Sequence, residues 1–209
     1  MRILIADDHA IVREGLKQIL AETADMIVAD EASSGHEALE KVRQNDYDVI
    51  VLDISMPGKS GLDVLKELRR YKPKLPVLVL SIHPEDQYAV RCLRAGAAGY
   101  LTKESASDEL VTAIKKVSEG KKYLTSTVAE KLAYAVGSDM DRPVHETLSD
   151  REYEVLCMIA QGKTVGQIAG DLNLSVKTIS TYRARILEKM GMETNAQLIH
   201  YGINNQLVH

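Results

Sequence analysis

The chain has 209 residues, of which 45% are apolar and 27% charged, and its formal net charge is −4. This composition excludes a disordered or fibrous protein and allows two compact domains. No apolar run approaches the roughly 20 residues of a membrane helix, and no signal peptide is apparent, so we expect a cytoplasmic protein with no membrane partner. Cys92 and Cys157 have no paired spacing, which favours buried small side chains over a disulfide or a zinc site.

Strand and helix patterns alternate through the first 120 residues. Five short apolar segments are typical of strands: residues 3–6, 27–29, 49–52, 77–80 and 99–102. The helix after the first strand has an apolar stripe made of Ile11, Val12, Leu16, Ile19 and Leu20. Repeated βα units predict an α/β fold, a five-stranded parallel doubly wound sheet with helices on both faces.

The second part of the chain has no strand pattern. Residues 120–145 read as a linker with a short helix near residues 128–136, which separates a domain at 1–119 from one at 146–209. Four helices follow, and their N-terminal capping residues are Ser149, Thr164, Ser175 and Thr194. Only Asn173-Leu174-Ser175 separates the second helix from the third, which predicts an all-α domain containing a helix-turn-helix.

The third of these helices has two different faces. A helical wheel places Ile179, Ile186 and Met190 on one side, and Lys177, Ser180, Thr181, Ala184, Arg185 and Glu188 on the other. Small, polar and basic side chains suit the major groove of DNA. An ordinary solvent-exposed face has the same composition, so this helix alone does not establish nucleic-acid binding.

Polar side chains stand at the ends of four predicted strands. Asp7 and Asp8 follow the first strand, Asp53 ends the third, Ser81 follows the fourth and Lys103 follows the fifth. In an open parallel α/β sheet, chemistry collects at the carboxyl ends of the strands. Each residue alone could be an ordinary polar strand end, but together they predict a site.

Three crowded carboxylates need a compensating cation. Mg²⁺ fits, because it prefers oxygen ligands and is usually held by one or two carboxylates together with a phosphate. With the cation screening the pocket, an Asp53 oxygen can attack phosphorus as a nucleophile. Lys103 would then pair with the phosphoryl oxygens and Ser81 would donate a hydrogen bond to one of them.

These residues also carry a family resemblance. Asp7-Asp8, Asp53 with Met56-Pro57-Gly58, Ser81 and the segment from Ala95 to Lys103 together resemble the receiver domain of bacterial two-component response regulators. The segment 148–156, with Ile168-Ala169 and Lys177-Thr178-Ile179, resembles the LuxR-type helix-turn-helix. The domain order is similar to that of the NarL/FixJ subfamily, and the resemblance covers nearly the whole chain. It implies a flavodoxin/CheY-like receiver followed by a four-helix DNA-binding domain.

The resemblance implies a role for each residue of the first site. A sensor histidine kinase would phosphorylate Asp53, and Mg²⁺ would be held by Asp8, Asp53 and the backbone carbonyl of Ser55, with Asp7 assisting. Ser81 and Tyr100 would form the switch pair, with Lys103 on the phosphoryl group. From the residues alone, Tyr100 could equally be a half-buried strand aromatic.

The resemblance also implies a set of DNA contacts: Lys177, Thr178, Ser180, Thr181, Arg183, Arg185 and Lys189. The wheel places Arg183 near the apolar side instead, where only a snorkelling phosphate contact is possible. One helix-turn-helix offers few base contacts, so we expect a homodimer on double-stranded DNA when the protein is phosphorylated. The final helix could supply the dimer contact, but its apolar positions favour core packing: Leu198, Ile199, Ile203 and Leu207.

The leading hypothesis is a phosphorylation-controlled transcription factor that is not an enzyme. One alternative is an aspartate-nucleophile phosphatase, although Asp53 has no second acid at the spacing that such chemistry uses. Another is a receiver with a protein-binding or RNA-binding output.

Overall fold

The computed structural model describes every residue except 57, 127, 131, 133–142, 206 and 209. The chain divides into two compact units, residues 1–134 and 135–209, and each is described here by itself. Among the described residues, no helix has the length and apolar character needed to cross a membrane.

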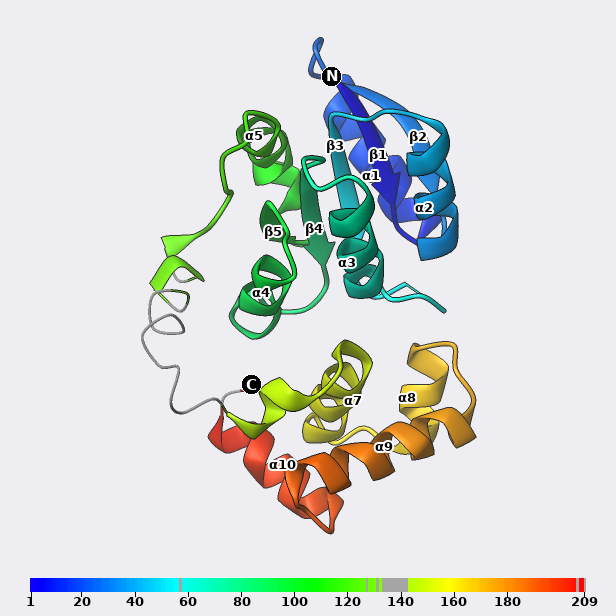
Figure 1. Ribbon diagram of the computed structural model, residues 1–209, viewed down its shortest axis with the longest axis vertical. Helices are drawn as coiled ribbons and strands as arrows, with labels where there is room; N and C mark the ends of the chain where they lie inside the picture. The colour runs from blue at the N-terminus through cyan, green and yellow to red at the C-terminus, as the bar shows by residue number, and fades with distance from the viewer. Residues whose placement is uncertain (57, 127, 131, 133–142, 206, 209) are drawn as a thin grey trace. The chain divides into compact units, whose positions relative to one another are not determined.

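The N-terminal unit contains a five-stranded parallel sheet in the order β2-β1-β3-β4-β5 (Figure 1). Its strands are β1 (Arg2–Ala6), β2 (Ile27–Ala32), β3 (Val49–Asp53), β4 (Val77–Ser81) and β5 (Gly99–Thr102). All five predicted strands are confirmed. Strand β2 extends beyond its predicted end to Ala32, because an edge strand accommodates polar residues such as Asp30 and Glu31.

Helices cover both faces of this sheet (Figure 1). Their bounds are α1 (Ala10–Ala21), α2 (Gly35–Gln44), α3 (Gly61–Tyr71), α4 (Glu85–Arg94) and α5 (Ala106–Ser118). Leu16 and Leu20 of α1 and Ile114 of α5 pack against alternate strand residues such as Ile3 and Ile5 on one face. Helices α2 and α3 pack together on the other face. The doubly wound architecture is confirmed.

One residue of the predicted α1 stripe faces solvent. The side chain of Ile11 is 83% exposed, whereas Leu16 and Leu20 are buried. The helical neighbours of Ile11 at the following turns are Glu14, Gly15 and Gln18, and this polar surface does not contact the sheet. Placing Ile11 in the core stripe was therefore wrong.

The start of the predicted linker packs on the N-terminal unit. Tyr123 forms a parallel bridge with Gly99, and its hydroxyl donates to Glu109. Residues 126, 128–130 and 132 are helical, and the rest of the predicted short helix lies outside the described residues. Gly120, which has a φ of +78°, follows α5 at the expected helix end.

The C-terminal unit is helical. After a short 3₁₀ segment, η1 (Val144–Thr147), come α7 (Asp150–Ala160), α8 (Val165–Asp171), α9 (Val176–Met190) and α10 (Asn195–Asn204). All four predicted N-caps accept a backbone hydrogen bond, and the caps of α7, α8 and α10 form complete capping boxes. Asn173, with a φ of +52°, makes the turn between α8 and α9. The predicted all-α domain is confirmed.

Candidate functional site

Strand register brings the predicted acidic and basic side chains to one edge of the sheet. Ala6 of β1 is level with Leu52 of β3, and Ser81 of β4 is level with Thr102 of β5. The residues at or just after these strand ends therefore lie together at the carboxyl edge of the sheet. Asp53, the last residue of β3, pairs in register with Leu80 of β4 at this edge. Parallel pairing is the physical reason that distant segments meet there.

Lys103 bridges two of the carboxylates. Its Nζ lies 2.7 Å from Asp7 Oδ2 and 2.7 Å from Asp53 Oδ2. Asp7 and Asp53 are each only 1% exposed, and the backbone N–H of Ser55 donates to Asp53 Oδ1 at 3.0 Å. Asp8 lies in the same cluster, so three carboxylates face one lysine, and the cluster keeps an excess of negative charge.

Burial and charge act on Asp53 in opposite directions. Burial raises the pKa of Asp53, the positive charge of Lys103 lowers it and the nearby Asp7 raises it, which leaves the pKa above its ordinary value. Burial alone would lower the pKa of Lys103, but attraction to Asp53 and hydrogen bonds to both aspartates leave that pKa raised. A nucleophilic carboxyl must be ionised, so a further cation at this cluster would favour its reactive form.

The same cluster can hold a metal ion. Ligand atoms of Asp7, Asp8, His9 and Asp53 all lie within 4.8 Å of one another. Asp8 Oδ1 is buried, and His9 Nδ1 lies 2.9 Å from it. The donors are mainly carboxylate oxygens, so they suit a hard divalent cation such as Mg²⁺. His9 was not among the predicted ligands, although its position directly after two acidic residues is a signal.

Ser81 and Tyr100 meet at the backbone of His83. The N–H of His83 donates to Ser81 Oγ at 3.0 Å, and the Tyr100 hydroxyl donates to the carbonyl of His83 at 2.8 Å. Tyr100 is 1% exposed, so the half-buried interpretation of this residue was wrong. Burial raises the pKa of Tyr100, while a hydrogen bond with Ser81 lowers it. No sequence pattern pointed to His83.

A glycine lets α3 begin directly on β3. The N–H of Gly61 donates to the carbonyl of Ile54 at 3.1 Å. A Cβ at position 61 would collide with the backbone of Asp53 and Ile54, so this close approach requires glycine. The loop that carries Ser55 is therefore closed at its base.

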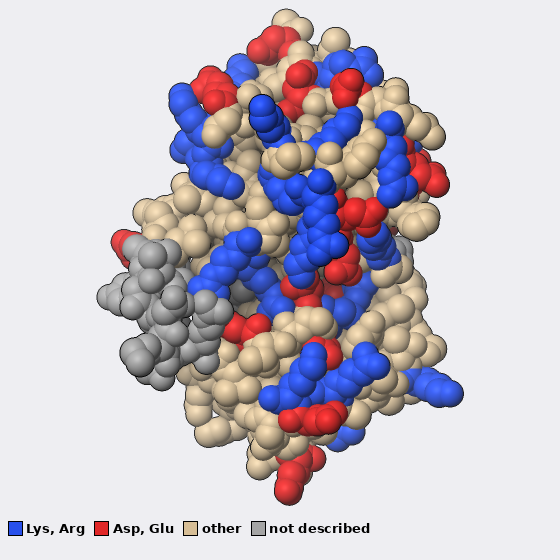
Figure 2. Space-filling view, viewed as in Figure 1, with Lys and Arg blue, Asp and Glu red and all other residues tan. Residues whose placement is uncertain are grey.

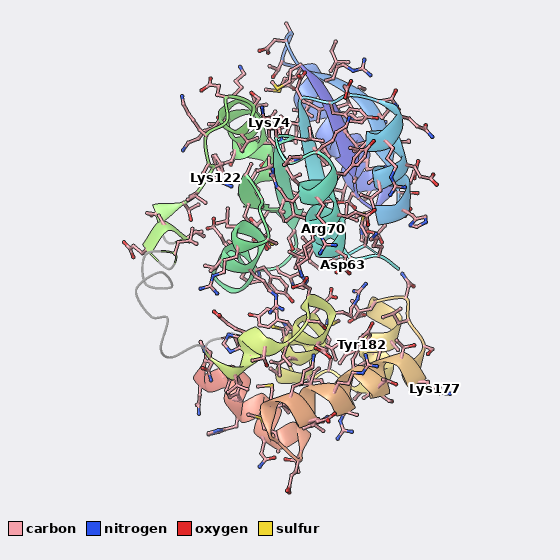
Figure 3. The ribbon with its side chains drawn as sticks, viewed as in Figure 1. Asp63, Arg70, Lys74, Lys122, Lys177 and Tyr182 are labelled. Atoms are coloured by element: carbon pink, nitrogen blue, oxygen red, sulfur yellow. The ribbon has the colours of Figure 1, made fainter. Side chains whose placement is uncertain are left out.

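The two faces of α9 are as the wheel predicts. Ile179, Ile186 and Met190 are buried, while Lys177 and Arg185 are exposed. A surface hollow is lined by Ser175, Lys177, Thr178, Thr181, Tyr182 and Arg185. Figure 3 labels Lys177 and Tyr182 on this helix, and Figure 2 shows basic and acidic side chains on the surface of the C-terminal unit. Tyr182, which the wheel did not assign to either face, is half-buried and lines this hollow.

Two residues of the DNA-contact set bind side chains on neighbouring helices. Arg183 is half-buried, and its Nε donates to Asn195 Oδ1 of α10. Lys189 Nζ donates to Glu152 Oε2 of α7 at 2.6 Å. The structure therefore gives both side chains a packing role that the resemblance did not imply, and for Arg183 it agrees with the wheel.

We expect Lys189→Met to lower the stability of the C-terminal unit at neutral pH by about 2 kcal/mol, because it removes a hydrogen bond to a buried carboxylate. Burial raises the pKa of Glu152, but hydrogen bonds from Lys189 and Ser149 outweigh it, and the pKa stays below its ordinary value of 4.5. Such a carboxylate stabilises the fold above its unfolded pKa, and this contribution is lost as the pH falls through the folded pKa. The variant should therefore lose less stability than the wild type below about pH 4.5.

Thermal unfolding of the full chain at several pH values measures this effect. Lys163→Met is the matched control, because Lys163 pairs with Asp171 on the surface. Equal losses in the two variants would contradict a special role for Lys189.

Family models match both units of the chain. Residues 3–115 match the response regulator receiver domain, and residues 146–202 match the bacterial regulatory proteins of the luxR family. The chain is a two-component response regulator. Its receiver precedes a LuxR-type DNA-binding domain, the order of the NarL/FixJ subfamily, and the protein is a DNA-binding transcription regulator.

This response regulator is similar to several curated proteins over its whole length. Response regulator UvrY of Escherichia coli K12 is 35% identical over 208 residues, which cover 99% of this chain and 95% of that protein. Response regulator GacA of Pseudomonas aeruginosa is 35% identical over 210 residues, which cover 100% of this chain and 98% of that protein.

Solved structures also resemble this response regulator. RcsB from Salmonella enterica serovar Typhimurium, bound to the promoter rprA with the phosphomimetic BeF₃⁻, has a TM-score of 0.63 and 29% identity, covering 96% of this chain and 98% of that one. A second RcsB–DNA complex has a TM-score of 0.60 and 29% identity, covering 96% of each chain.

Proposed function

We propose that a sensor histidine kinase transfers a phosphoryl group to Asp53 and that this modification controls sequence-specific DNA binding through α9. The observation that carries the proposal is the position of Asp53, a buried carboxylate at the carboxyl end of β3 that is paired with Lys103. The domain composition supports the second part of the proposal, because a receiver joined to a DNA-binding domain allows phosphorylation to control DNA binding.

The proposed reaction moves one phosphoryl group. An oxygen of Asp53 attacks phosphorus, the phosphorus–nitrogen bond of the kinase phosphohistidine breaks, and an acyl phosphate remains on the receiver. Lys103 exchanges part of its pairing with Asp53 for the phosphoryl oxygens, and the Ser81 hydroxyl donates to another of these oxygens. Tyr100 completes the switch pair.

Mg²⁺ is the proposed cofactor of this reaction. Asp8, Asp53 and the backbone carbonyl of Ser55 would hold the ion, with Asp7 assisting. The ion supplies positive charge that screens the incoming phosphoryl group from the carboxylates. The excess of acidic over basic groups at the cluster supports this assignment.

Because the modification is stoichiometric, we propose that the protein is a switch rather than an enzyme, and that it works in the cytoplasm.

The proposed DNA interface is the exposed face of α9. Lys177, Thr178, Ser180, Thr181 and Arg185 are offered to the major groove, while Arg183 and Lys189 contribute only if they leave their present partners. A single helix reads few bases, so a dimer on two half-sites is proposed. RcsB, which is similar to this chain, is present as two dimers bound to two parallel DNAs in one solved structure, and this supports a dimer here.

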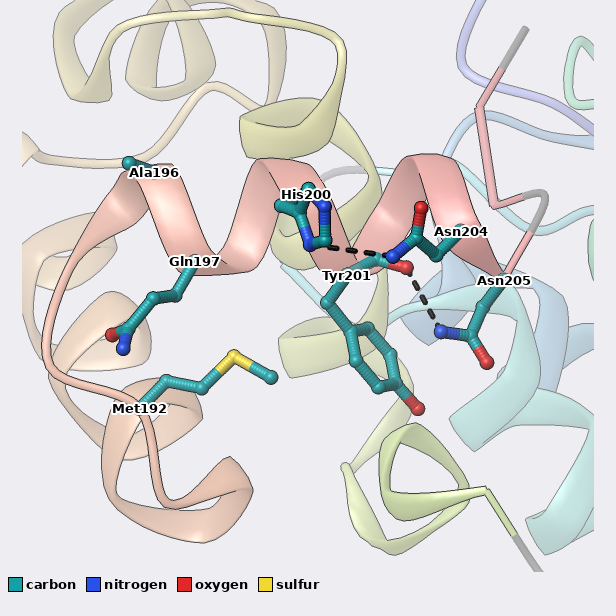
Figure 4. Close-up of a pocket in the computed structure, with 7 residues that line it drawn as sticks. All are labelled: Met192, Ala196, Gln197, His200, Tyr201, Asn204 and Asn205. Atoms are coloured by element: carbon teal, nitrogen blue, oxygen red, sulfur yellow. Dashed lines mark hydrogen bonds between the residues drawn. The ribbon is translucent and has the colours of Figure 1, made fainter.

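A groove along α10 is the proposed dimer contact. Its lining consists of Met192, Ala196, Gln197, His200, Tyr201, Asn204 and Asn205 (Figure 4). Leu198 and Leu207 are buried in the domain core, as predicted, whereas Ile203 is 58% exposed, so the prediction of core packing was wrong for this residue. For the domain boundaries we retain 1–119, 120–145 and 146–209 as proposals.

Selection of bound sequences from random duplex DNA, with and without beryllofluoride, tests the proposed function. We expect one enriched, near-palindromic motif whose recovery increases when beryllofluoride occupies the receiver. Sustained turnover of phosphate monoesters would favour the phosphatase alternative. Preference for single-stranded RNA over duplex DNA would favour an RNA-binding output and contradict the proposal.

A further inference from the structure

We propose that the ring of His83 is a positioning device of the receiver: it fixes the loop of Ser55 against α4 and thereby tunes the affinity for Mg²⁺ and the phosphoryl group. The inference rests on the proposed function, since it concerns the same site. His83 lies between β4 and α4, outside the set of residues to which a direct role is assigned.

The His83 ring joins two segments that are distant in the sequence. Its Nε2 forms a hydrogen bond of 3.1 Å with Ser55 Oγ, on the loop that follows β3. The ring also stacks on Tyr88 of α4, with centroids 4.3 Å apart and planes 18° from parallel. The ring therefore lies between the loop of the phosphoacceptor and the first turns of α4.

The backbone of the same residue holds the switch pair. Its N–H binds the Ser81 hydroxyl and its carbonyl accepts from the Tyr100 hydroxyl. A displacement of His83 consequently changes the partners of Ser81 and Tyr100 as well as the support of Ser55. Through these contacts His83 links the proposed metal ligand Ser55 to the switch pair of Ser81 and Tyr100.

The contact to Ser55 matters because of what Ser55 does at the site. Its N–H already donates to Asp53 Oδ1, and its carbonyl is the proposed Mg²⁺ ligand from the main chain. Groups that orient metal ligands typically contribute 10-fold to 100-fold to metal affinity. Ser55 lies in a loop without regular secondary structure, so the bond to the His83 ring orients a residue that helix or strand hydrogen bonds do not.

A double-mutant cycle tests the proposal in the full chain. The variants are His83→Ala, Ser55→Ala and the double variant. Ser55→Ala removes only the side-chain hydroxyl and leaves every main-chain group at the site in place. Mg²⁺ affinity is measured by calorimetry, and beryllofluoride binding in the presence of Mg²⁺ by fluorine NMR. We expect each single variant to bind Mg²⁺ about 10-fold more weakly, with no further loss in the double variant.

Two more variants separate the ring contacts from general damage. His83→Phe keeps an aromatic ring to stack on Tyr88 but has no ring nitrogen, so its Mg²⁺ affinity should match that of Ser55→Ala. His36→Ala, at an exposed position of α2, should bind as the wild type does. Ser55→Ala and His83→Phe also carry the test if His83→Ala does not fold.

The outcomes distinguish this inference from the proposed function. A wild type that binds neither Mg²⁺ nor beryllofluoride would contradict the proposed function itself. A wild type that binds both, with single variants of unchanged affinity or with losses that multiply in the double variant, would overturn only the role of His83. A lowered melting temperature with unchanged Mg²⁺ affinity would likewise show a purely structural contact and overturn the proposal.

Discussion

Asp53→Asn is expected to abolish labelling of the protein by a phosphorylated histidine kinase or by a small phosphodonor. The amide cannot form the acyl phosphate, and the other carboxylates lack its position between Lys103 and the Ser55 N–H. The fold should survive at neutral pH, because the pKa of Asp53 is raised and the folded state therefore disfavours its charged form. Radiolabel incorporation and the melting temperature measure the two effects.

Asp46→Asn is the matched control for this loss. The Asp46 side chain is 99% exposed and pairs with Lys72 on the surface, so the same chemical change there should leave labelling at the wild-type level. Full incorporation of label into Asp53→Asn would mean that another side chain accepts the phosphoryl group.

Arg185→Ala is expected to weaken binding to the selected DNA motif by roughly 10-fold to 100-fold, because a side chain that reaches base edges contributes about 1–3 kcal/mol of discrimination. Thr181→Ala should have a smaller effect in the same direction, since it removes a single hydroxyl, which now donates to the carbonyl of Lys177. Neither variant should change phosphorylation of Asp53, and fluorescence anisotropy with labelled duplex measures the affinities.

A charge-matched control separates base reading from general attraction to DNA. Lys163→Ala removes one positive charge outside α9, so it reports the effect of net charge alone. Binding of Arg185→Ala and Thr181→Ala at the wild-type affinity would show that the exposed face of α9 is not the reading surface.

Much of the receiver fold could be predicted because its strands are buried on both faces. Strands such as β3 and β4 are fully buried and therefore read as unbroken apolar runs. Edge strand β2 contains polar residues and does not form an unbroken apolar run. Its last residues were therefore missed, because polar side chains suit a sheet edge. The capping residues of the C-terminal helices could also be predicted from the sequence, since a cap is a local feature that needs no tertiary contact.

The carboxylate cluster was predictable for a different reason. Parallel pairing places the carboxyl ends of β1, β3 and β5 at one edge of the sheet. Asp7, Asp53 and Lys103 each lie at or just after such an end, and this position is enough to predict that they meet. His9 was missed although it directly follows the two aspartates that it contacts, whereas His83 was missed because it acts through contacts with another loop and with a helix. A sequence pattern records spacing along the chain and does not record such contacts.

The DNA-contact set shows where a helical wheel reaches its limit. The wheel gives the direction of each side chain from the axis of α9, and it correctly separates the buried from the exposed positions. It cannot show that Lys189 binds a carboxylate on α7 or that Arg183 binds an amide on α10. Those partners depend on how neighbouring helices pack.

The close approach of Gly61 to β3 joins the start of α3 to the end of the phosphoacceptor strand. The N–H of Gly61 donates to the carbonyl of Ile54, and a Cβ at position 61 would lie 2.1 Å from the carbonyl oxygen of Asp53. Any side chain at this position would therefore push the start of α3 away from the backbone of the phosphoacceptor itself. The absence of a side chain at position 61 is in this sense a requirement of the acidic pocket, although Gly61 contributes no group to its chemistry.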